Sequence, residues 1–301
     1  MIRVLRLLSL LSLLEGVALA KEVHVVATVP TLAALASEVV GDHGEVISLA
    51  LHTQDPHFVD ARPNLALALS RADLLVLTGL GLEVGWLPTL LTGSRNGRIQ
   101  PGSVGYLDAS RHVQVLQIPT SAVDRSMGDI HPGGNPHYHL DPRAARPVVV
   151  ALAERLGTLD PEHAGDYQLN AKLFLVELDA AIARWQEQAQ PLRGIPVIDL
   201  HRSWPYVADW LGFEIVADIE PKPGVPPTPR HVLAVIGLAR ERGVGLVIQE
   251  SWLPSNVSRT VAEKSGARLL ILDAQADFRG GQTYVQHVDA LVSALVAGVT
   301  P

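Results

Sequence analysis

Short β-branched segments alternate with longer amphipathic segments along this chain, and one long helix-forming segment divides the alternation into two parts. Strands that alternate with helices favour a mainly parallel sheet. The first part has predicted strands at 23–29, 46–49 and 74–78, and predicted helices at 32–40, 63–70 and from 142 toward 157. The second part has predicted strands at 195–199, 213–219, 246–249 and 268–272, and predicted helices at 206–211, 230–242, 256–264 and 284–299. The sequence therefore predicts two α/β units.

The dividing segment begins at Asp160-Pro161 and extends to Gln190, with Gly165 as its one internal glycine. Asp160 has the position of an N-cap before a proline at the first helical position. A helix of about thirty residues would be ~45 Å long, which exceeds the width of a small domain. We therefore predict an N-terminal lobe at 21–159, a long connecting helix at 160–191 and a C-terminal lobe at 192–301.

The first twenty residues have the pattern of a secretory signal peptide. Arg3 and Arg6 precede a leucine-rich stretch, and small residues follow at 18–20. This apolar stretch is well short of the ~20 residues that span a bilayer, so we expect residues 1–20 to be a cleaved signal. The chain contains no cysteine, so it has no disulfides and no usual acceptor for a bacterial lipid anchor. The expected form is a periplasmic protein that is not a lipoprotein.

The charge of the chain argues against a nucleic-acid partner. Removal of residues 1–20 takes away two arginines and one glutamate, which changes the formal net charge from −7 to −8. An acidic chain without a basic stripe is a poor candidate for nucleic-acid binding. With 48% hydrophobic residues, the chain has ample material for buried cores.

Three histidines and one aspartate lie where predicted strands end or a predicted helix begins. His57 and His201 follow strands, Asp273 ends one, and His137 precedes the helix that starts at Pro142. Ligands of open parallel sheets bind beyond the carboxyl ends of the strands, so these residues are expected to meet in a cleft between the lobes. Three imidazoles and a carboxylate suit Zn²⁺, with manganese or iron as alternatives. A shell of four protein ligands favours capture of the metal over catalysis, so we predict no enzyme activity.

Four segments resemble, in order, the motifs of the solute-binding proteins of bacterial zinc and manganese ABC transporters. They are QDPHFVDARPNLALALSRADLLVLTGLGLEVGWL at 54–87, NPHYHLDP at 135–142, EPKPGVPPTPRHV at 220–232 and QESWLPSNVSRTVAEKSGARLLILD at 249–273. The resemblance implies two α/β lobes joined by one long helix and places the metal ligands at His57, His137, His201 and Asp273. It also implies Zn²⁺ as cargo, with Mn²⁺ as the alternative, and delivery to an ABC permease in the inner membrane.

Four further residues are candidates for auxiliary roles near this site. Members of the resembled family usually have an aromatic residue at the position of His139. His139 is therefore a candidate for one of three roles: a packing residue, an outer partner of a ligand, or an alternative ligand. In an extended segment its side chain would point away from that of His137. His131 lies in the loop 121–134, which is either a flap over the site or a plain surface loop. Glu220 and Glu250 are candidate partners that orient a ligand imidazole.

Two other functions compete with metal transport. A binding protein for an organic solute would use aromatic walls and an arginine, for which Arg202 and Trp204 are available. A secreted zinc hydrolase would need an open coordination position, and the chain has no HExxH motif. A histidine at position 201, where manganese-binding relatives often have glutamate, favours zinc. We expect a monomer and leave open whether a periplasmic metallochaperone loads it.

Overall fold

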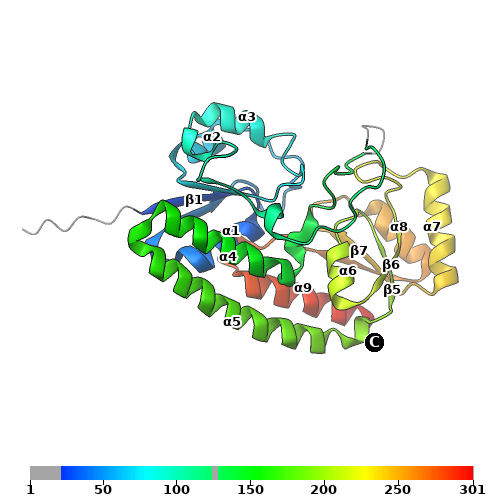
Figure 1. Ribbon diagram of the computed structural model, residues 1–301. Coiled ribbons are helices and arrows are strands. Elements are labelled where there is room, and N and C mark those ends of the chain that lie inside the picture. The colour runs from blue at the N-terminus through cyan, green and yellow to red at the C-terminus, as the bar shows by residue number, and fades with distance from the viewer. Residues whose placement is uncertain (1–21, 124–127, 301) are drawn as a thin grey trace, which may run out of the picture.

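The computed structural model describes residues 22–123 and 128–300, so the predicted signal peptide lies outside the described residues. Two four-stranded parallel sheets lie side by side (Figure 1). The first has the strand order β2-β1-β3-β4 and consists of β1 (Val23–Ala27), β2 (Gly44–Ser48), β3 (Leu74–Leu77) and β4 (Tyr106–Asp108). The second has the order β6-β5-β7-β8 and consists of β5 (Pro196–Asp199), β6 (Glu214–Asp218), β7 (Leu246–Glu250) and β8 (Arg268–Leu272). The predicted two-lobed α/β fold is confirmed.

Burial of each strand follows its position in the sheet. The inner strands β3 and β7 are fully buried, as expected for strands of a parallel sheet that is covered on both faces. The edge strands β2, β6 and β8 are only partly buried. The prediction missed β4, which has three residues, because so short a strand carries no periodic signal.

Helices cover both faces of each sheet and form three hydrophobic cores. The helices α2 (Pro63–Arg71) and α3 (Leu87–Ser94) cover the outer face of the first sheet, and α7 (Pro229–Arg242) and α8 (Asn256–Ser265) cover that of the second. One core extends through both lobes and includes side chains of α1 (Pro30–Val40), α4 (Pro142–Leu159), α5 (Ala164–Gln188), α6 (Pro205–Leu211) and α9 (Tyr284–Val299). The 3₁₀ turns are η1 (Gly41–His43), η2 (Gly97–Ile99), η3 (Ala109–His112), η5 (His137–Leu140), η6 (Pro161–His163), η7 (Gln190–Leu192) and η8 (Phe278–Gly280).

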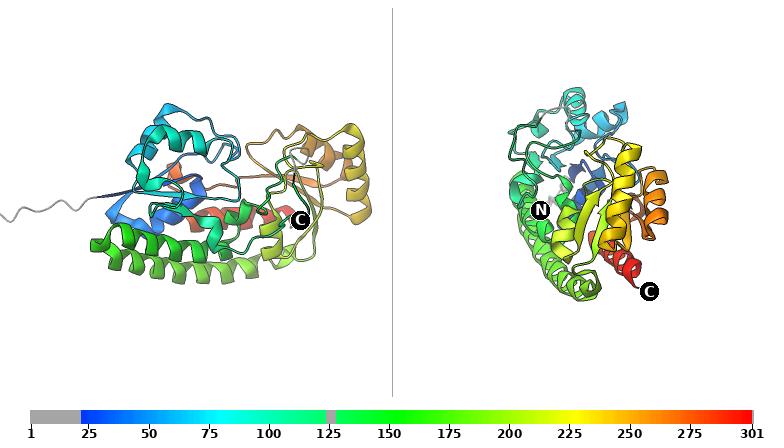
Figure 2. Two further views of the ribbon diagram at one scale, coloured as in Figure 1. Left: turned by 45° about the horizontal axis from the view of Figure 1, so that its top comes forward. Right: turned by 90° about the vertical axis from the view of Figure 1, so that its right-hand side faces the viewer.

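The long helix α5 runs alongside both lobes, as the views in Figures 1 and 2 show. Its 25 residues correspond to a length of about 37 Å. The prediction that it starts at Asp160-Pro161 is wrong, because η6 precedes it. The Asp160 carboxylate instead accepts a hydrogen bond from the Tyr167 hydroxyl at 2.6 Å and lies 2.7 Å from Nδ1 of His163. The assigned lobe boundaries at 159 and 191 remain predictions.

One stripe of α5 holds the shared core together. Its buried residues recur at alternating spacings of four and three: Tyr167, Ala171, Phe174, Leu178, Ala181 and Trp185. This is the spacing that keeps one face of a helix against a neighbour. The neighbours of this face include α1, α4 and α9, so the helix contributes to the packing of both lobes. The opposite face carries exposed apolar residues such as Leu173.

Replacement of Leu178 by alanine is expected to lower the free energy of unfolding by about 2–5 kcal/mol, because the side chain is fully buried in the shared core and its removal leaves a cavity. Leu173→Ala is the matched control on the exposed face of the same helix, with an expected change within about 0.5 kcal/mol. Urea unfolding of both variants measures the difference. Equal effects would show that the buried stripe does not carry the stability of α5.

The strand order places the carboxyl ends of the strands where a ligand site is expected. In each sheet, connections leave in opposite directions from a central pair, β1 and β3 or β5 and β7. The crevice beyond this switch point is the usual binding place in open parallel sheets. Among the described residues, no helix is both long and apolar enough to cross a membrane.

Candidate metal centre

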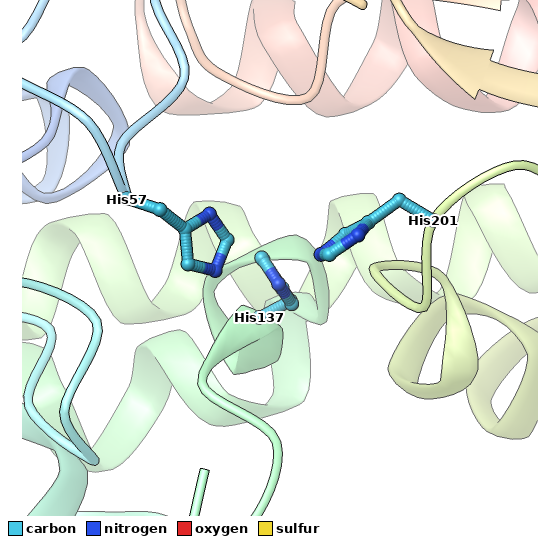
Figure 3. A group of neighbouring side chains, drawn as sticks. All are labelled: His57, His137 and His201. Atoms are coloured by element: carbon cyan, nitrogen blue, oxygen red, sulfur yellow. The ribbon is translucent and has the colours of Figure 1, made fainter. Parts of the chain in front are cut away.

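Three histidine side chains converge between the two lobes. One ring nitrogen from each of His57, His137 and His201 lies within 4.8 Å of the others, and no other such group of three exists among the residues that the structure describes. The ring centroids are 5.3–5.6 Å apart. Figure 3 shows the three rings facing one another from three different segments of the chain. Three of the four predicted ligands therefore meet, although they are 80 and 64 residues apart in the sequence.

A repeated local turn fixes the backbone of two of these histidines. The sequences are Asp55-Pro56-His57 and Asn135-Pro136-His137. In each, the backbone N–H of the histidine donates a 2.9 Å hydrogen bond to the side-chain oxygen two residues earlier. Asp and Asn form such turns because their short side chains reach the backbone two positions on. The same Asp55 oxygen lies 2.8 Å from Nδ1 of His57, so it orients the ring as well as the backbone.

His137 is the first residue of η5, which contacts both lobes. The next residue, Tyr138, donates a hydrogen bond from its hydroxyl to the backbone carbonyl of Thr78, directly after β3. Asn135 donates from Nδ2 to the carbonyl of Arg202, directly after His201. The Tyr206 hydroxyl on α6 also donates to the Asn135 carbonyl at 2.8 Å. The turn that carries His137 is therefore anchored at the carboxyl ends of strands in both sheets.

His201 follows β5 at the switch point of the second sheet, and acidic residues surround it. Its Nδ1 lies 2.9 Å from Oε2 of Glu220, and that oxygen also accepts a hydrogen bond from the backbone N–H of Gly224 at 2.7 Å. Burial alone would lower the pKa of His201, but the Glu220 hydrogen bond and the nearby charges of Glu250, Glu220 and Asp55 raise it overall. Glu250 is fully buried at the end of β7, and burial raises its pKa.

His137 has the opposite electrostatic setting. Burial, and then the proximity of His57, His201, His139 and His131, lower the pKa of His137 well below its usual value. A buried imidazole that stays neutral keeps its lone pair available for a cation. For Asp55, burial would raise the pKa, but the hydrogen bond and charge of His57 outweigh it and lower the pKa.

Asp273 lies outside the three-histidine group and is exposed. It follows β8, which is an edge strand two places from β5 in the second sheet. Its carboxylate is instead a neighbour of the buried His287, where it opposes the lowering of the His287 pKa by burial. Its assignment as a ligand remains a prediction from the sequence.

His139 is buried but also lies outside the group. His137 and His139 belong to a 3₁₀ turn and not to an extended segment. With three residues per turn, positions two apart still project in different directions. Nε2 of His139 lies 2.8 Å from Nε2 of Gln275, whose Oε1 accepts a hydrogen bond from the Thr31 hydroxyl. His139 therefore connects η5 to the segment after β8 and to α1.

His131 lies next to the group without being part of the compact set of three. Its Nε2 is 3.4 Å from Nε2 of His57, and the two ring centroids are 5.4 Å apart. Burial and the neighbouring His57 and His201 lower the pKa of His131 to about 4, while a backbone hydrogen bond with Leu80 acts in the opposite direction. Residues 124–127 of its loop lie outside the described residues, and the role of the loop as a flap or a plain surface loop remains a prediction.

A small cavity lies beside the histidine group. Its lining includes His131, His137, His201, Asn135 and Arg202, and its volume is about 50 Å³. This volume is enough for an ion with one or two waters and far below the ~300 Å³ or more of a pocket for an organic molecule. Arg202 is engaged with Asp218 in a hydrogen bond of 2.8 Å, and Trp204 is fully buried. The geometry favours an ion over an organic solute.

Two residues that hydrogen-bond to the three-histidine group were not predicted from the sequence, namely Asp55 and Asn135. Both precede a proline and a histidine, and this shared pattern is the signal that identifies them. Glu220, predicted as an outer partner, makes its hydrogen bond to His201, whereas Glu250 acts on His201 through its charge.

The fold and the histidine group define a class of two-lobed α/β binding proteins with a metal site between the lobes. The family described as zinc-uptake complex component A, periplasmic, matches residues 25–298. This match covers most of the chain. The chain belongs to this family.

The proteins similar in sequence include zinc uptake proteins and a manganese-binding protein. The high-affinity zinc uptake system protein ZnuA of Brucella abortus is 27% identical over 161 residues, which are 53% of this chain and 48% of that protein. This chain therefore matches about half the length of that relative. ZnuA of Bacillus subtilis is 22% identical over 91% of this chain and 88% of its own. The manganese-binding lipoprotein MntA of Halalkalibacterium halodurans is 23% identical over a match that covers 87% of this chain and 83% of that protein.

Solved structures share the fold. A crystal structure of a ZnuA deletion mutant with zinc bound has a TM-score of 0.78 and 25% identity, and the match covers 93% of this chain and 99% of that one. The solute-binding protein FpvC of Pseudomonas aeruginosa in complex with Mn²⁺ has a TM-score of 0.74 and 22% identity, covering 93% and 98%. At 22% identity, the similarity to FpvC shows a shared fold alone.

Proposed function

We propose that this protein captures a zinc ion between its two lobes and delivers it to an ABC permease in the inner membrane for import. The observation that carries the proposal is the convergence of His57, His137 and His201 from segments associated with both sheets. Neutral imidazoles are ligands of choice for Zn²⁺. The zinc uptake proteins among the relatives support the same cargo.

The surroundings of the three rings support tight and specific binding. Asp55 and Glu220 each contact the Nδ1 atom of a ligand histidine, which fixes the ring and leaves Nε2 to face the ion. These carboxylates lie behind the ligands, where they also offset the positive charge of the cargo. A set of nitrogen donors held in this way is suited to capture, and we propose a transport protein in place of an enzyme.

The location and partners follow from the same proposal. We propose a periplasmic protein that acts as a monomer and is not a lipoprotein, since the sequence offers no cysteine for lipid attachment. The permease is the partner that would accept the ion. Loading by a periplasmic metallochaperone would be a further step, and the manganese-binding relative makes Mn²⁺ the alternative cargo.

Competition titration of the metal-free, tag-free protein tests the cargo. Zinc is expected to bind at one equivalent per chain and more tightly than manganese by at least about two orders of magnitude, because nitrogen donors favour zinc over manganese. Comparable affinities for the two ions would make manganese transport the better account. Absence of stoichiometric binding of either ion would contradict the proposed function.

A further inference from the structure

The group of three histidines leaves one position of a tetrahedral zinc shell to be filled, and His131 is the nearest further imidazole. Two nitrogens bound to one tetrahedral zinc at about 2.0–2.1 Å lie about 3.3–3.4 Å apart. The distance between Nε2 of His131 and Nε2 of His57 is 3.4 Å. The centroid distance of this pair, 5.4 Å, equals that between His57 and His201. His131 is therefore placed relative to His57 as a second ligand of the same ion would be.

The outer contacts of His57 and His131 determine which of their ring nitrogens carry lone pairs toward each other. Nδ1 of His57 lies 2.8 Å from the Asp55 carboxylate, so Nδ1 carries the proton and Nε2 is bare. The His131 ring hydrogen-bonds the backbone of Leu80. Its Nδ1 lies close to the next residue, Gly81, at 3.4 Å from the position that a Cβ would occupy there. When the bond to Leu80 is made by Nδ1, Nε2 of His131 is bare as well, and two bare nitrogens at this separation repel each other unless a cation lies between them.

The loop that carries His131 is fixed on both lobes. The backbone N–H of Asp129 donates to the carbonyl of Pro223 in the second lobe at 2.8 Å. A Cβ on Gly128 would come within 2.2 Å of that same carbonyl oxygen, so the absence of a side chain permits the approach. On the other side of His131, the N–H of Asn135 donates to the carbonyl of Leu116 at 2.9 Å. His131 is thus held over the site from both directions.

We infer that His131 is the fourth protein ligand, in the position that the sequence resemblance gives to Asp273. This inference rests on the proposed metal-binding function. The resulting shell consists of four imidazoles and carries no charge of its own. Such a shell takes borderline divalent cations such as zinc, and it disfavours manganese, which prefers oxygen ligands. The described part of the loop, residues 128–134, then determines metal choice as well as covering the site.

The test compares His131→Ala and Asp273→Ala with His112→Ala, which removes an exposed histidine at the end of η3. Zinc affinity is measured by competition with a chromogenic chelator. His131→Ala is expected to bind at least about tenfold more weakly, since loss of a ligand should cost at least as much as loss of an outer partner. Asp273→Ala and His112→Ala are expected to stay within about threefold of the wild-type protein.

X-ray absorption at the zinc edge supplies a measure that a merely structural role of His131 would not change. The inference predicts four imidazoles around zinc in the wild-type protein and three in His131→Ala. Three imidazoles in the wild-type protein, or full affinity of His131→Ala, would overturn it. If the wild-type protein binds no zinc, the proposed function itself fails, and this outcome is distinct because it appears before any variant is made.

Discussion

Replacement of His137 by alanine is expected to weaken zinc binding by more than about 100-fold, which exceeds the 10–100-fold loss typical of removing an outer partner of a ligand. The side chain is buried, and its ring lies next to those of both His57 and His201. No other side chain of η5 is part of the three-histidine group. The remaining imidazoles would therefore have to hold the ion with one ligand fewer. Competition titration with the metal-free variant measures the loss.

The fold of His137→Ala should be preserved, and this separates a lost ligand from a lost structure. Burial and neighbouring histidines already disfavour the charged form of His137, so its removal leaves no buried charge without a partner. Thermal unfolding of the metal-free variant should resemble that of the wild-type protein. Excess zinc at about 100 times Kd should stabilise the wild-type protein by about 2.7 kcal/mol and the variant far less at the same concentration. His112→Ala is the control, and a His137→Ala affinity within threefold of it would refute the assignment.

Zinc affinity is expected to fall as the pH decreases, beginning above the ordinary histidine pKa of about 6.5. A ligand imidazole must be neutral, so a raised pKa brings proton competition to higher pH. The pKa of His201 is raised by Glu220, Glu250 and Asp55 despite burial, whereas that of His137 is lowered. His201 therefore takes up a proton before His137 does. Each proton that zinc must displace costs about tenfold in affinity per pH unit.

Glu220→Gln distinguishes this mechanism from general acid sensitivity. The variant removes the charge-assisted hydrogen bond to His201, so the pKa of His201 should fall and the onset of affinity loss should move to lower pH. Glu241→Gln, at an exposed position of α7, is the control and should leave the onset unchanged. Affinities are measured by chelator competition from pH 8 to pH 5. An onset that is the same in both variants would contradict the role assigned to Glu220.

Regular, locally encoded features were predictable from the sequence. Alternating strand and helix signals gave two parallel sheets, because each signal depends on nearby residues alone. The helix predicted to start at Pro142 does start there, and the Asp141 side chain before it accepts a hydrogen bond from the backbone N–H of Arg143 at 2.8 Å. The start of α5 was not predictable in this way. Asp160 precedes a proline, as an N-cap residue often does, but its carboxylate contacts His163 and Tyr167.

The candidate site was predictable in part, for reasons that differ between residues. His57, His137 and His201 were identified because each lies beside the end of a strand or the start of a helix. Asp273 satisfies the same criterion, yet it is exposed and lies outside the group, and the direction in which a side chain points after a strand is not a local property of the sequence. The contact of His131 with His57 depends on how a loop crosses between lobes, which no local pattern encodes.

The location of zinc in crystals of the loaded protein tests the central claim most directly. Anomalous diffraction at the zinc absorption edge should give one strong peak between the ring nitrogens of His57, His137 and His201, at a distance of about 2.0–2.1 Å from each. Surface pairs such as His43 and Asp166, whose side chains lie 3.0 Å apart, should give weak peaks at most. A principal peak at such a surface pair, or no peak between the three histidines, would contradict a zinc site between the lobes.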